Sequence, residues 1–205
     1  GEMAAWIKHG NGQKLWDELY APFGIRGFQA GSTGTQMFGW FRREIRSLAD
    51  LDGLKFRTPG NQGRVLQKLG VTPVSLPGGE IFPALQSGAI DGAEWVGPYN
   101  DLALGFYQVC RYYYSPGYHE PGPALQLTVN EQAWRSLPPD LQAAILKAGK
   151  EAGAYGRQVE SGEDTAKLEA LEKANKLKRV PFTDRDAMKK LADPVMDAYA
   201  KEIGI

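Results

Sequence analysis

Hydrophobic and polar positions between residues 51 and 95 alternate between the period of a strand and the period of a helix. A short apolar strand is predicted at residues 54–56, and Pro59 and Gly60 follow it as a turn into a helix. A second strand, a second helix and a third strand complete the stretch up to Trp95. Strands that alternate with helices in this way predict an α/β fold with a mainly parallel sheet.

The flanking segments add further helices and strands to this pattern. Before residue 20, apolar positions at helical spacing are interrupted by Gly10 and Gly12, which predicts two short helices. After Pro138, an Ala-, Glu- and Lys-rich pattern predicts a long helix that continues to about residue 176. The remaining predicted elements are strands at 23–28, 111–114, 124–129 and 178–181 and helices at 100–106 and 184–203.

Composition narrows the class of protein. The chain of 205 residues is 42% hydrophobic and 23% charged, which is ordinary for a globular protein. Its 24 basic and 24 acidic side chains cancel, so nothing indicates binding to nucleic acid or to an anionic membrane surface. No apolar run approaches the length of a membrane span, and the N-terminus has no basic start or apolar signal core. Either the chain is cytoplasmic or its leader has been removed.

Cys110 is the single cysteine of the sequence, so it has no partner for an intrachain disulfide. It lies in the apolar segment 106–114. This setting favours a small buried hydrophobic side chain over a reactive thiol.

Arg57 lies at the tip of the first predicted strand, where its chemistry suits a ligand. In open α/β sheets, ligands bind outside the carboxyl ends of the strands. A guanidinium can donate two parallel hydrogen bonds to a carboxylate, which fixes orientation as well as charge. From the residues alone, a ligand carboxylate and a structural acid are equally good partners for this arginine.

Several motifs follow one another along the chain. GLKFR stands at residues 53–57, GVTP at 70–73 and ALQSGAIDGAE at 84–94, with further matching segments at 35–42, 94–101 and 117–120. In this order they resemble the extracytoplasmic solute-binding subunit of the tripartite ATP-independent periplasmic (TRAP) transporters. The branch they resemble binds 2-oxo and 2-hydroxy monocarboxylates such as pyruvate and lactate. The resemblance runs from about Gly27 to the C-terminus, and a set of ordered motifs is more specific than a lone glycine pattern.

The resemblance implies a two-lobed fold of the periplasmic-binding-protein type with a hinge. The chain resembles the C-terminal two-thirds of such a protein, so the first lobe is expected to be incomplete. Residues 1–50 are expected to form part of lobe I and the entry to the hinge, residues 51–123 lobe II, and residues 124–205 the return to lobe I with long C-terminal helices. The expected location is periplasmic or extracytoplasmic, with the signal peptide absent from this chain.

The same resemblance assigns the ligand site. It implies that Arg57 binds the ligand's carboxylate and that Gln36 (side chain), Trp95 (main-chain carbonyl) and Glu120 (carboxylate) enclose a metal cation, with Glu94 beside them. Hard oxygen donors of this kind suit calcium or sodium. Trp95 and Tyr99 are expected to close over the ligand, and the tyrosine hydroxyl can address its 2-oxygen.

From the residues alone, the same positions have plainer interpretations. Gln36, Trp95 and Glu120 then favour surface or satisfied core roles. His119 can be a metal ligand or a base, but a single histidine without an organised partner favours a structural or exposed role.

Three functions remain open at this point. The first is a binding protein that closes on a small organic acid anion and delivers it to the membrane permease subunits of a TRAP transporter. The second is a metal-assisted enzyme acting on a 2-oxo acid, with His119 or Glu120 as the base. Against an enzyme stands the lack of a serine elbow, a Cys-His pair, a phosphate loop or a histidine cluster at metalloenzyme spacing. The third is an incomplete or engineered fragment of the binding protein.

An incomplete first lobe has a physical consequence for the isolated chain. Sheets without neighbouring strands expose apolar faces and unpaired edges, which recruit other chains. We therefore expect the chain to need a missing N-terminal segment or a companion chain, and we consider a homodimer possible.

Overall fold

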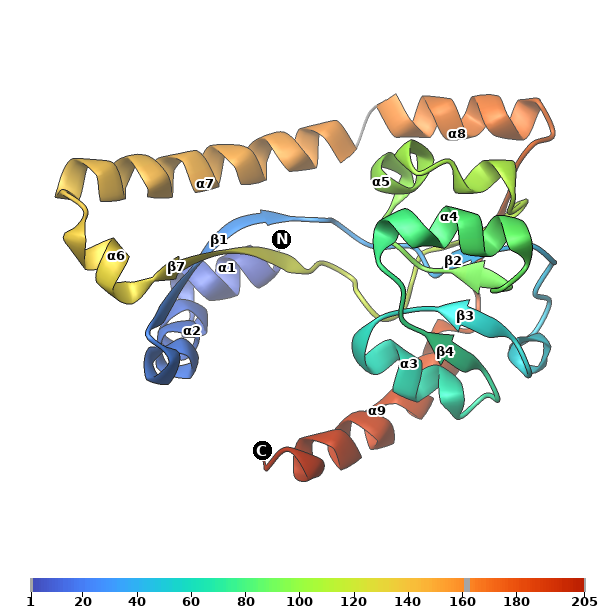
Figure 1. The fold of residues 1–205 in the computed structure, drawn as a ribbon, viewed down its shortest axis with the longest axis horizontal. Coiled ribbons are helices and arrows are strands. Elements are labelled where there is room, and N and C mark those ends of the chain that lie inside the picture. The colour runs from blue at the N-terminus through green and yellow to red at the C-terminus, as the bar shows by residue number, and fades with distance from the viewer. Residues whose placement is uncertain (1, 161–162, 205) are drawn as a thin grey trace. The chain divides into compact units, whose positions relative to one another are not determined.

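The computed structural model describes residues 2–160 and 163–204, and it contains two compact units (Figure 1). The first unit is formed by residues 2–34 and 122–160. The second unit is formed by residues 35–121 and 163–204. Along the sequence the chain thus passes from the first unit to the second, back to the first, and then to the second again, where it ends.

The first unit is a two-stranded antiparallel sheet with helices packed against it (Figure 1). Its strands are β1 (Ile25–Ser32) and β7 (Ala124–Asn130), and its helices are α1 (Glu2–His9), α2 (Gly12–Tyr20), α6 (Glu131–Ser136) and α7 (Pro139–Glu160), with a 3₁₀ turn at Ala21–Phe23. Helix α7 approaches β1 closely because it presents glycines there: a Cβ on Gly153 would lie 3.3 Å from the Cα of Gly31. The two short helices predicted at the start of the chain are confirmed.

The second unit is built on a six-stranded sheet in the order β4-β3-β5-β2-β6-β8. Its strands are β2 (Gly39–Phe41), β3 (Lys55–Arg57), β4 (Thr72–Val74), β5 (Gly92–Ala93), β6 (Tyr112–Ser115) and β8 (Lys178–Pro181). Strand β2 is antiparallel to both neighbours, and the other pairs are parallel. The predicted α/β fold is confirmed; three of the five strand pairs in the six-stranded sheet are parallel, and the two-stranded sheet is antiparallel. The sequence pattern predicts the successive strands β3, β4 and β5, of which β3 pairs in parallel with the other two. It does not indicate which distant strands β2 pairs with.

Helices cover both faces of this sheet (Figure 1). One face packs on α3 (Gly60–Gln67) and α9 (Arg185–Glu202), and the other on α4 (Gly78–Ser87), α5 (Pro98–Ala103) and α8 (Glu163–Lys173); 3₁₀ turns lie at Leu48–Leu51 and Phe106–Gln108. Successive strand residues point to opposite faces. Accordingly, Trp40 and Tyr113 belong to one buried cluster, and Phe41 and Tyr114 belong to the other.

The compact units begin and end at other residues than the predicted lobes. Residues 35–50, which were expected in lobe I, include the central strand β2 of the second unit. The predicted long helix is two helices, α7 and α8, and residues 161–162 lie outside the described part of the chain. Helices α8 and α9 belong to the second unit because Leu168 and Met188 are buried in the two clusters that cover its sheet. Among the described residues, no helix is both long and apolar enough to cross a membrane.

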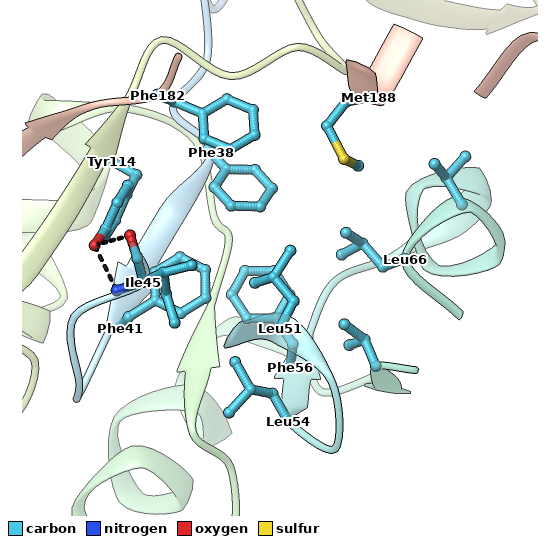
Figure 2. Close-up of a cluster of buried hydrophobic side chains, with 12 residues drawn as sticks. Phe38, Phe41, Ile45, Leu51, Leu54, Phe56, Leu66, Tyr114, Phe182 and Met188 are labelled. Carbon is cyan, nitrogen blue, oxygen red and sulfur yellow. Dashed lines mark hydrogen bonds between the residues drawn. The ribbon is translucent and has the colours of Figure 1, made fainter. Parts of the chain in front are cut away.

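One buried cluster is closed by a tyrosine that bonds to the main chain (Figure 2). Phe38 stacks on Phe182 with ring centroids 4.2 Å apart, and Phe41 stacks on Phe56 at 5.0 Å. The Tyr114 hydroxyl accepts a hydrogen bond from the Ile45 N–H (2.7 Å) and donates one to the Ile45 carbonyl (2.8 Å). The Tyr114 hydroxyl therefore pairs with both main-chain polar groups of Ile45, which is buried and lies outside the strands.

Tyr114→Phe should lower the free energy of unfolding by about 1–3 kcal/mol, because it leaves the N–H and the C=O of Ile45 buried without a partner. Thermal and urea unfolding measure the change. Tyr155→Phe is the matched control, since that side chain is 70% exposed. Equal stability of the two variants would contradict this account.

A buried carboxylate lies in the cluster on the other face of the sheet. Asp101, in α5, is 1% exposed. Its Oδ2 accepts hydrogen bonds from Trp40 Nε1 (2.9 Å) and from the Tyr113 hydroxyl (2.8 Å), and its Oδ1 accepts one from the Val96 N–H (3.0 Å). Burial raises the pKa of Asp101 to about 7, against the opposing effect of these hydrogen bonds.

This raised pKa predicts a pH-dependent stability. The folded protein holds the Asp101 proton more tightly than the unfolded chain, whose pKa is near the ordinary 3.8. The stabilisation is therefore fully present below about pH 4 and is lost as the pH rises through about 7. Asp101→Asn does not titrate and serves as the reference. At about 1.4 kcal/mol per pKa unit, the stability of the wild type relative to this variant should fall by up to about 4 kcal/mol between pH 4 and 8. A difference that is constant or grows over this range would show that the three donors keep Asp101 ionised throughout.

Candidate functional site

Segments that are distant in the sequence meet at one edge of the six-stranded sheet. Arg57 ends β3, Glu94 follows β5, and Glu120 lies beyond the end of β6. Because β2 runs antiparallel to β5 and β6, its beginning lies at the edge where those strands end. Gln36, just before β2, therefore reaches the same edge, and its N–H donates to the Glu120 carbonyl (3.0 Å).

Arg57 is held by main-chain carbonyls. Its side chain is buried, with Nε donating to the Leu76 carbonyl (3.1 Å) and Nη1 donating to the Glu94 carbonyl (2.7 Å). These bonds use two of the five N–H groups of a guanidinium and fix its plane. Burial lowers the pKa of Arg57, and the negative charge of Glu94 opposes that effect. A buried guanidinium in a fixed orientation is a suitable partner for a carboxylate.

The Glu94 carboxylate lies between two basic side chains. Its Oε2 is 3.7 Å from Arg57 Nη1, and its Oε1 is 3.9 Å from His119 Nε2. All three side chains are at least nine-tenths buried. Both distances exceed those of hydrogen bonds, and neither ring nitrogen of His119 has a hydrogen-bond partner among the described residues. The site thus concentrates buried charge and unused hydrogen-bonding capacity at one place.

Gln36 and Glu120 are joined through their side chains as well as their main chains. The Gln36 side chain, which is 5% exposed, hydrogen-bonds to the Glu120 carboxylate. Burial raises the pKa of Glu120, and the nearby charge of Glu94 raises it further, while His119 and Gln36 act in the opposite direction. Negative charge on the Glu120 carboxylate is therefore disfavoured at this place.

Trp95 connects the Arg57 region to the start of α4. The Arg57 guanidinium carbon lies 4.9 Å from the centre of a Trp95 ring. The same indole packs on Gly78, the first residue of α4, where a Cβ would lie 2.7 Å from a ring carbon. A side chain at position 78 would displace the indole from the guanidinium. Glycine at position 78 therefore leaves the space that the Trp95 ring occupies.

Tyr99 differs from the other residues predicted for the site. It lies in the first turn of α5 rather than in the loop after β5, and it is 50% exposed. Among the described residues, no hydrogen bond, ion pair or ring contact joins Tyr99 to the other predicted site residues. The interactions described above connect five of the predicted residues, namely Gln36, Arg57, Glu94, Trp95 and Glu120.

Sequence reasoning missed three residues that shape the site. Leu76 supplies a carbonyl to Arg57, Gly78 accommodates the Trp95 ring, and Asp101 accepts a hydrogen bond from the main chain next to Trp95. Main-chain carbonyls have no sequence signal, and Asp101 resembles any acid in the first turn of a helix. The Gly78-Gly79 pair after Pro77 was a usable signal, because paired glycines at a helix start permit close approach of another side chain.

The donor set indicates which cations the site suits. Among residues 2–160 and 163–204 the structure contains no group of three or more His, Cys, Asp or Glu side chains that could hold a metal ion. Any cation bound here would depend also on the Gln36 amide oxygen and on main-chain carbonyls. Such neutral and anionic oxygen donors suit hard cations rather than zinc, copper or iron.

Several proteins similar to this chain bind small acids. The chain is 50% identical over 151 residues to a monocarboxylate 2-oxoacid-binding periplasmic protein of Nostoc sp., a match that covers 74% of this chain and 42% of the relative. The described fold has a TM-score of 0.90 and 40% identity to a TRAP transporter solute-binding protein from Bordetella bronchiseptica, covering 97% of this chain and 59% of that one. That protein is a mixed-occupancy dimer, with copurified calcium and picolinate at the bound active site.

A second crystallised protein carries a ligand of the predicted class. The TRAP periplasmic solute-binding protein from Colwellia psychrerythraea, with bound calcium and pyruvate, matches with a TM-score of 0.89 and 40% identity. The match covers 98% of this chain and 62% of that protein. The chain thus spans less than two-thirds of the length of each of these relatives.

The family model agrees with the motifs. Residues 1–202 match the model for bacterial extracellular solute-binding proteins of family 7, DctP. The resemblance predicted from about Gly27 onward is confirmed, and the match also includes the first helices. The chain therefore belongs to family 7 of the bacterial extracellular solute-binding proteins, the DctP family of TRAP solute-binding proteins.

Proposed function

We propose that the chain binds a small 2-oxo or 2-hydroxy monocarboxylate, such as pyruvate or lactate, together with a calcium or sodium ion. The observation that supports this most strongly is Arg57, which two main-chain carbonyls hold at the carboxyl edge of the sheet. Its remaining N–H groups match the two oxygens of one carboxylate. Because the guanidinium is oriented before the ligand arrives, little conformational freedom is lost on binding.

The residues around Glu120 fit a hard cation. Burial and the charge of Glu94 both raise the pKa of Glu120, and a positive ion at this place would offset both effects. In our proposal the Gln36 amide oxygen, the Glu120 carboxylate and the Trp95 main-chain carbonyl hold the ion, with the Glu94 carboxylate beside it. When bound, such an ion attracts the carboxylate and the 2-oxygen of the ligand, which favours 2-oxo and 2-hydroxy acids over simple carboxylic acids.

Aromatic side chains are proposed to complete the ligand site. The Trp95 ring, which is fixed against Gly78 and Arg57, offers an apolar surface beside the carboxylate position. The Tyr99 hydroxyl is proposed to reach the 2-oxygen of the ligand, and its exposure leaves it accessible to do so. This part of the proposal rests on the chemistry of the tyrosine side chain and on its exposure.

The proposed role is transport rather than catalysis. The family consists of solute-binding proteins, and the similar TRAP proteins support a periplasmic protein that hands its ligand to membrane permease subunits. His119 Nε2 lies 3.9 Å from Glu94 Oε1, but no hydrogen bond from any described residue orients its ring as a general base would require. We expect the protein to release its acid unchanged.

Arg57→Lys should weaken pyruvate binding roughly tenfold or more, because lysine keeps the charge but loses the paired charge-assisted hydrogen bonds, each worth about 1.5–3 kcal/mol. Lysine also cannot keep both the Leu76 and Glu94 bonds in one plane. Titration calorimetry with pyruvate in CaCl₂ measures the change, and pyruvate recovered from the cell should be chemically intact.

Arg46→Lys is the matched control for this substitution, since that side chain is 82% exposed and pairs with Glu44. It should bind pyruvate as the wild type does. Unchanged affinity in Arg57→Lys would remove Arg57 as the carboxylate anchor, and a loss of equal size in both variants would point to a non-specific charge effect.

Glu120→Gln should weaken binding of the cation and of pyruvate together, each by at least roughly tenfold, because a charged carboxylate ligand becomes a neutral amide and even outer-shell changes cost about 10–100-fold in metal affinity. The two losses must be coupled because ligands that share a site change each other's affinity reciprocally. Calcium is titrated in the presence and absence of pyruvate, and pyruvate in the presence and absence of CaCl₂ and NaCl.

Glu151→Gln, which changes a carboxylate whose side chain is 69% exposed, is the matched control and should leave both affinities unchanged. The cation hypothesis would be wrong if exhaustive chelation and dialysis into sodium-free buffer left the pyruvate affinity of the wild type intact.

A further inference from the structure

The peptide unit between Trp95 and Val96 is fixed from one side. The Val96 N–H donates to Asp101 Oδ1 at 3.0 Å. The Trp95 carbonyl belongs to the same planar unit as this N–H. In the described chain, the only cis peptide bond is Ser115–Pro116, so the unit is trans and its C=O points opposite to its N–H. The hydrogen bond to Asp101 therefore sets the direction of the Trp95 carbonyl, which points away from Asp101.

We propose that Asp101 is a positioning residue that aims the Trp95 main-chain carbonyl at the bound cation. This inference rests on the proposed function, in which that carbonyl is a cation ligand. The hydrogen bond from the Val96 N–H to Asp101 thus sets the direction of the Trp95 carbonyl oxygen.

Asp101 is itself held rigidly. Its other oxygen accepts hydrogen bonds from Trp40 on β2 and from Tyr113 on β6, and the two rings stack with centroids 4.0 Å apart. Neither ring is exposed to solvent. These two strands carry the segments that hold Gln36 and Glu120. One carboxylate therefore ties the main chain at Trp95 to the strands that position the other two proposed cation ligands.

The neighbouring peptide is fixed as well, which limits rotation of the segment. The Val96 carbonyl accepts a hydrogen bond from the Met37 N–H at 3.0 Å. Residue 37 directly follows Gln36 in the chain. Val96 is consequently bonded on both sides, to Asp101 through its N–H and to the Gln36 segment through its C=O. Hydrogen bonds that orient a ligand group in this way commonly change metal affinity by about 10–100-fold.

The test compares two variants of the same hydrogen-bonded group. Asp101→Ala removes the acceptor of the Val96 N–H, and it should weaken calcium binding in the presence of pyruvate by about 10–100-fold. Tyr113→Phe is the matched control: it removes one hydrogen bond to Asp101 but leaves the Val96 bond, so its calcium affinity should stay within about threefold of the wild type. Both are titrated well below their melting temperatures, so that loss of stability does not enter the comparison.

A spectroscopic readout separates orientation from general disturbance. Trp-Val occurs once in the sequence, at residues 95–96. Labelling with [1-¹³C]Trp and [¹⁵N]Val therefore gives a single HNCO cross-peak, which reports the Trp95 carbonyl and the Val96 N–H together. In the wild type, CaCl₂ with pyruvate should shift the carbonyl resonance. In Asp101→Ala the Val96 amide proton should move upfield without calcium, and the carbonyl shift at the same calcium concentration should be lost.

Asp101→Asn is the second variant if Asp101→Ala does not fold. An asparagine has one acceptor oxygen for the three donors that surround Asp101. The chemical shift of the Val96 amide proton shows whether the Val96 N–H still donates to that oxygen. Calcium affinity should be retained where that hydrogen bond persists and reduced where it is lost. A calcium affinity that does not depend on whether the Val96 hydrogen bond is present would overturn the inference.

The outcomes distinguish this inference from the proposed function. If the wild type shows no cation-dependent pyruvate binding, the proposed function fails and the inference falls with it. If the wild type binds but folded Asp101→Ala binds calcium equally well, or if the Trp95 carbonyl resonance does not respond to calcium, only the role of Asp101 is overturned.

Discussion

The antiparallel direction of strand β2 is the constraint on which the site depends. In a wholly parallel sheet, only residues after the strands reach the carboxyl edge. Because β2 runs the other way between β5 and β6, the residues before it reach that edge too. Gln36 thereby meets Glu120, and Met37 bonds to Val96. The site is therefore assembled from four chain segments that no single supersecondary motif could bring together.

Buried charge is the second feature that organises this edge. Arg57, Glu94 and His119 are at least nine-tenths buried, and their side chains approach at 3.7 and 3.9 Å without direct hydrogen bonds between them. A buried ion pair such as Arg57 with Glu94 contributes little net stability, because the loss of solvation offsets the attraction. They do provide an environment in which an incoming anion and cation interact strongly. The arrangement is consistent with a site whose electrostatics are completed by its ligands.

The sequence predicted the local elements of this fold better than their partners. The edge strand Lys178–Pro181 was predicted with its observed bounds, and the buried state of Cys110 is confirmed, with burial raising the pKa of its thiol to about 12. Local period and composition contain that information. Strand β2 has only three residues and gives no period, and the apolar faces of α8 and α9 do not reveal which sheet they cover. For the same reason the predicted lobe boundaries differ from those of the compact units.

The site shows the same division. Arg57 was predicted from its place at a strand end, and Gln36, Glu94, Trp95 and Glu120 from the resemblance to the family. Asp101 was missed because its importance comes from three donors at positions 40, 96 and 113, which only the tertiary structure brings together. Residues that act directly on a ligand carry recognisable chemistry, whereas residues that position them are defined by packing.

The central claim is that a small 2-oxo acid and a hard cation bind together at the carboxyl edge of the six-stranded sheet. A crystal structure of the chain grown with pyruvate and CaCl₂, with anomalous diffraction to locate calcium, tests it most directly. The account predicts calcium against the Glu120 carboxylate, the Gln36 amide oxygen and the Trp95 carbonyl, with the pyruvate carboxylate on Arg57. Calcium and pyruvate bound at separate places, or a pyruvate carboxylate that does not contact Arg57, would contradict the account.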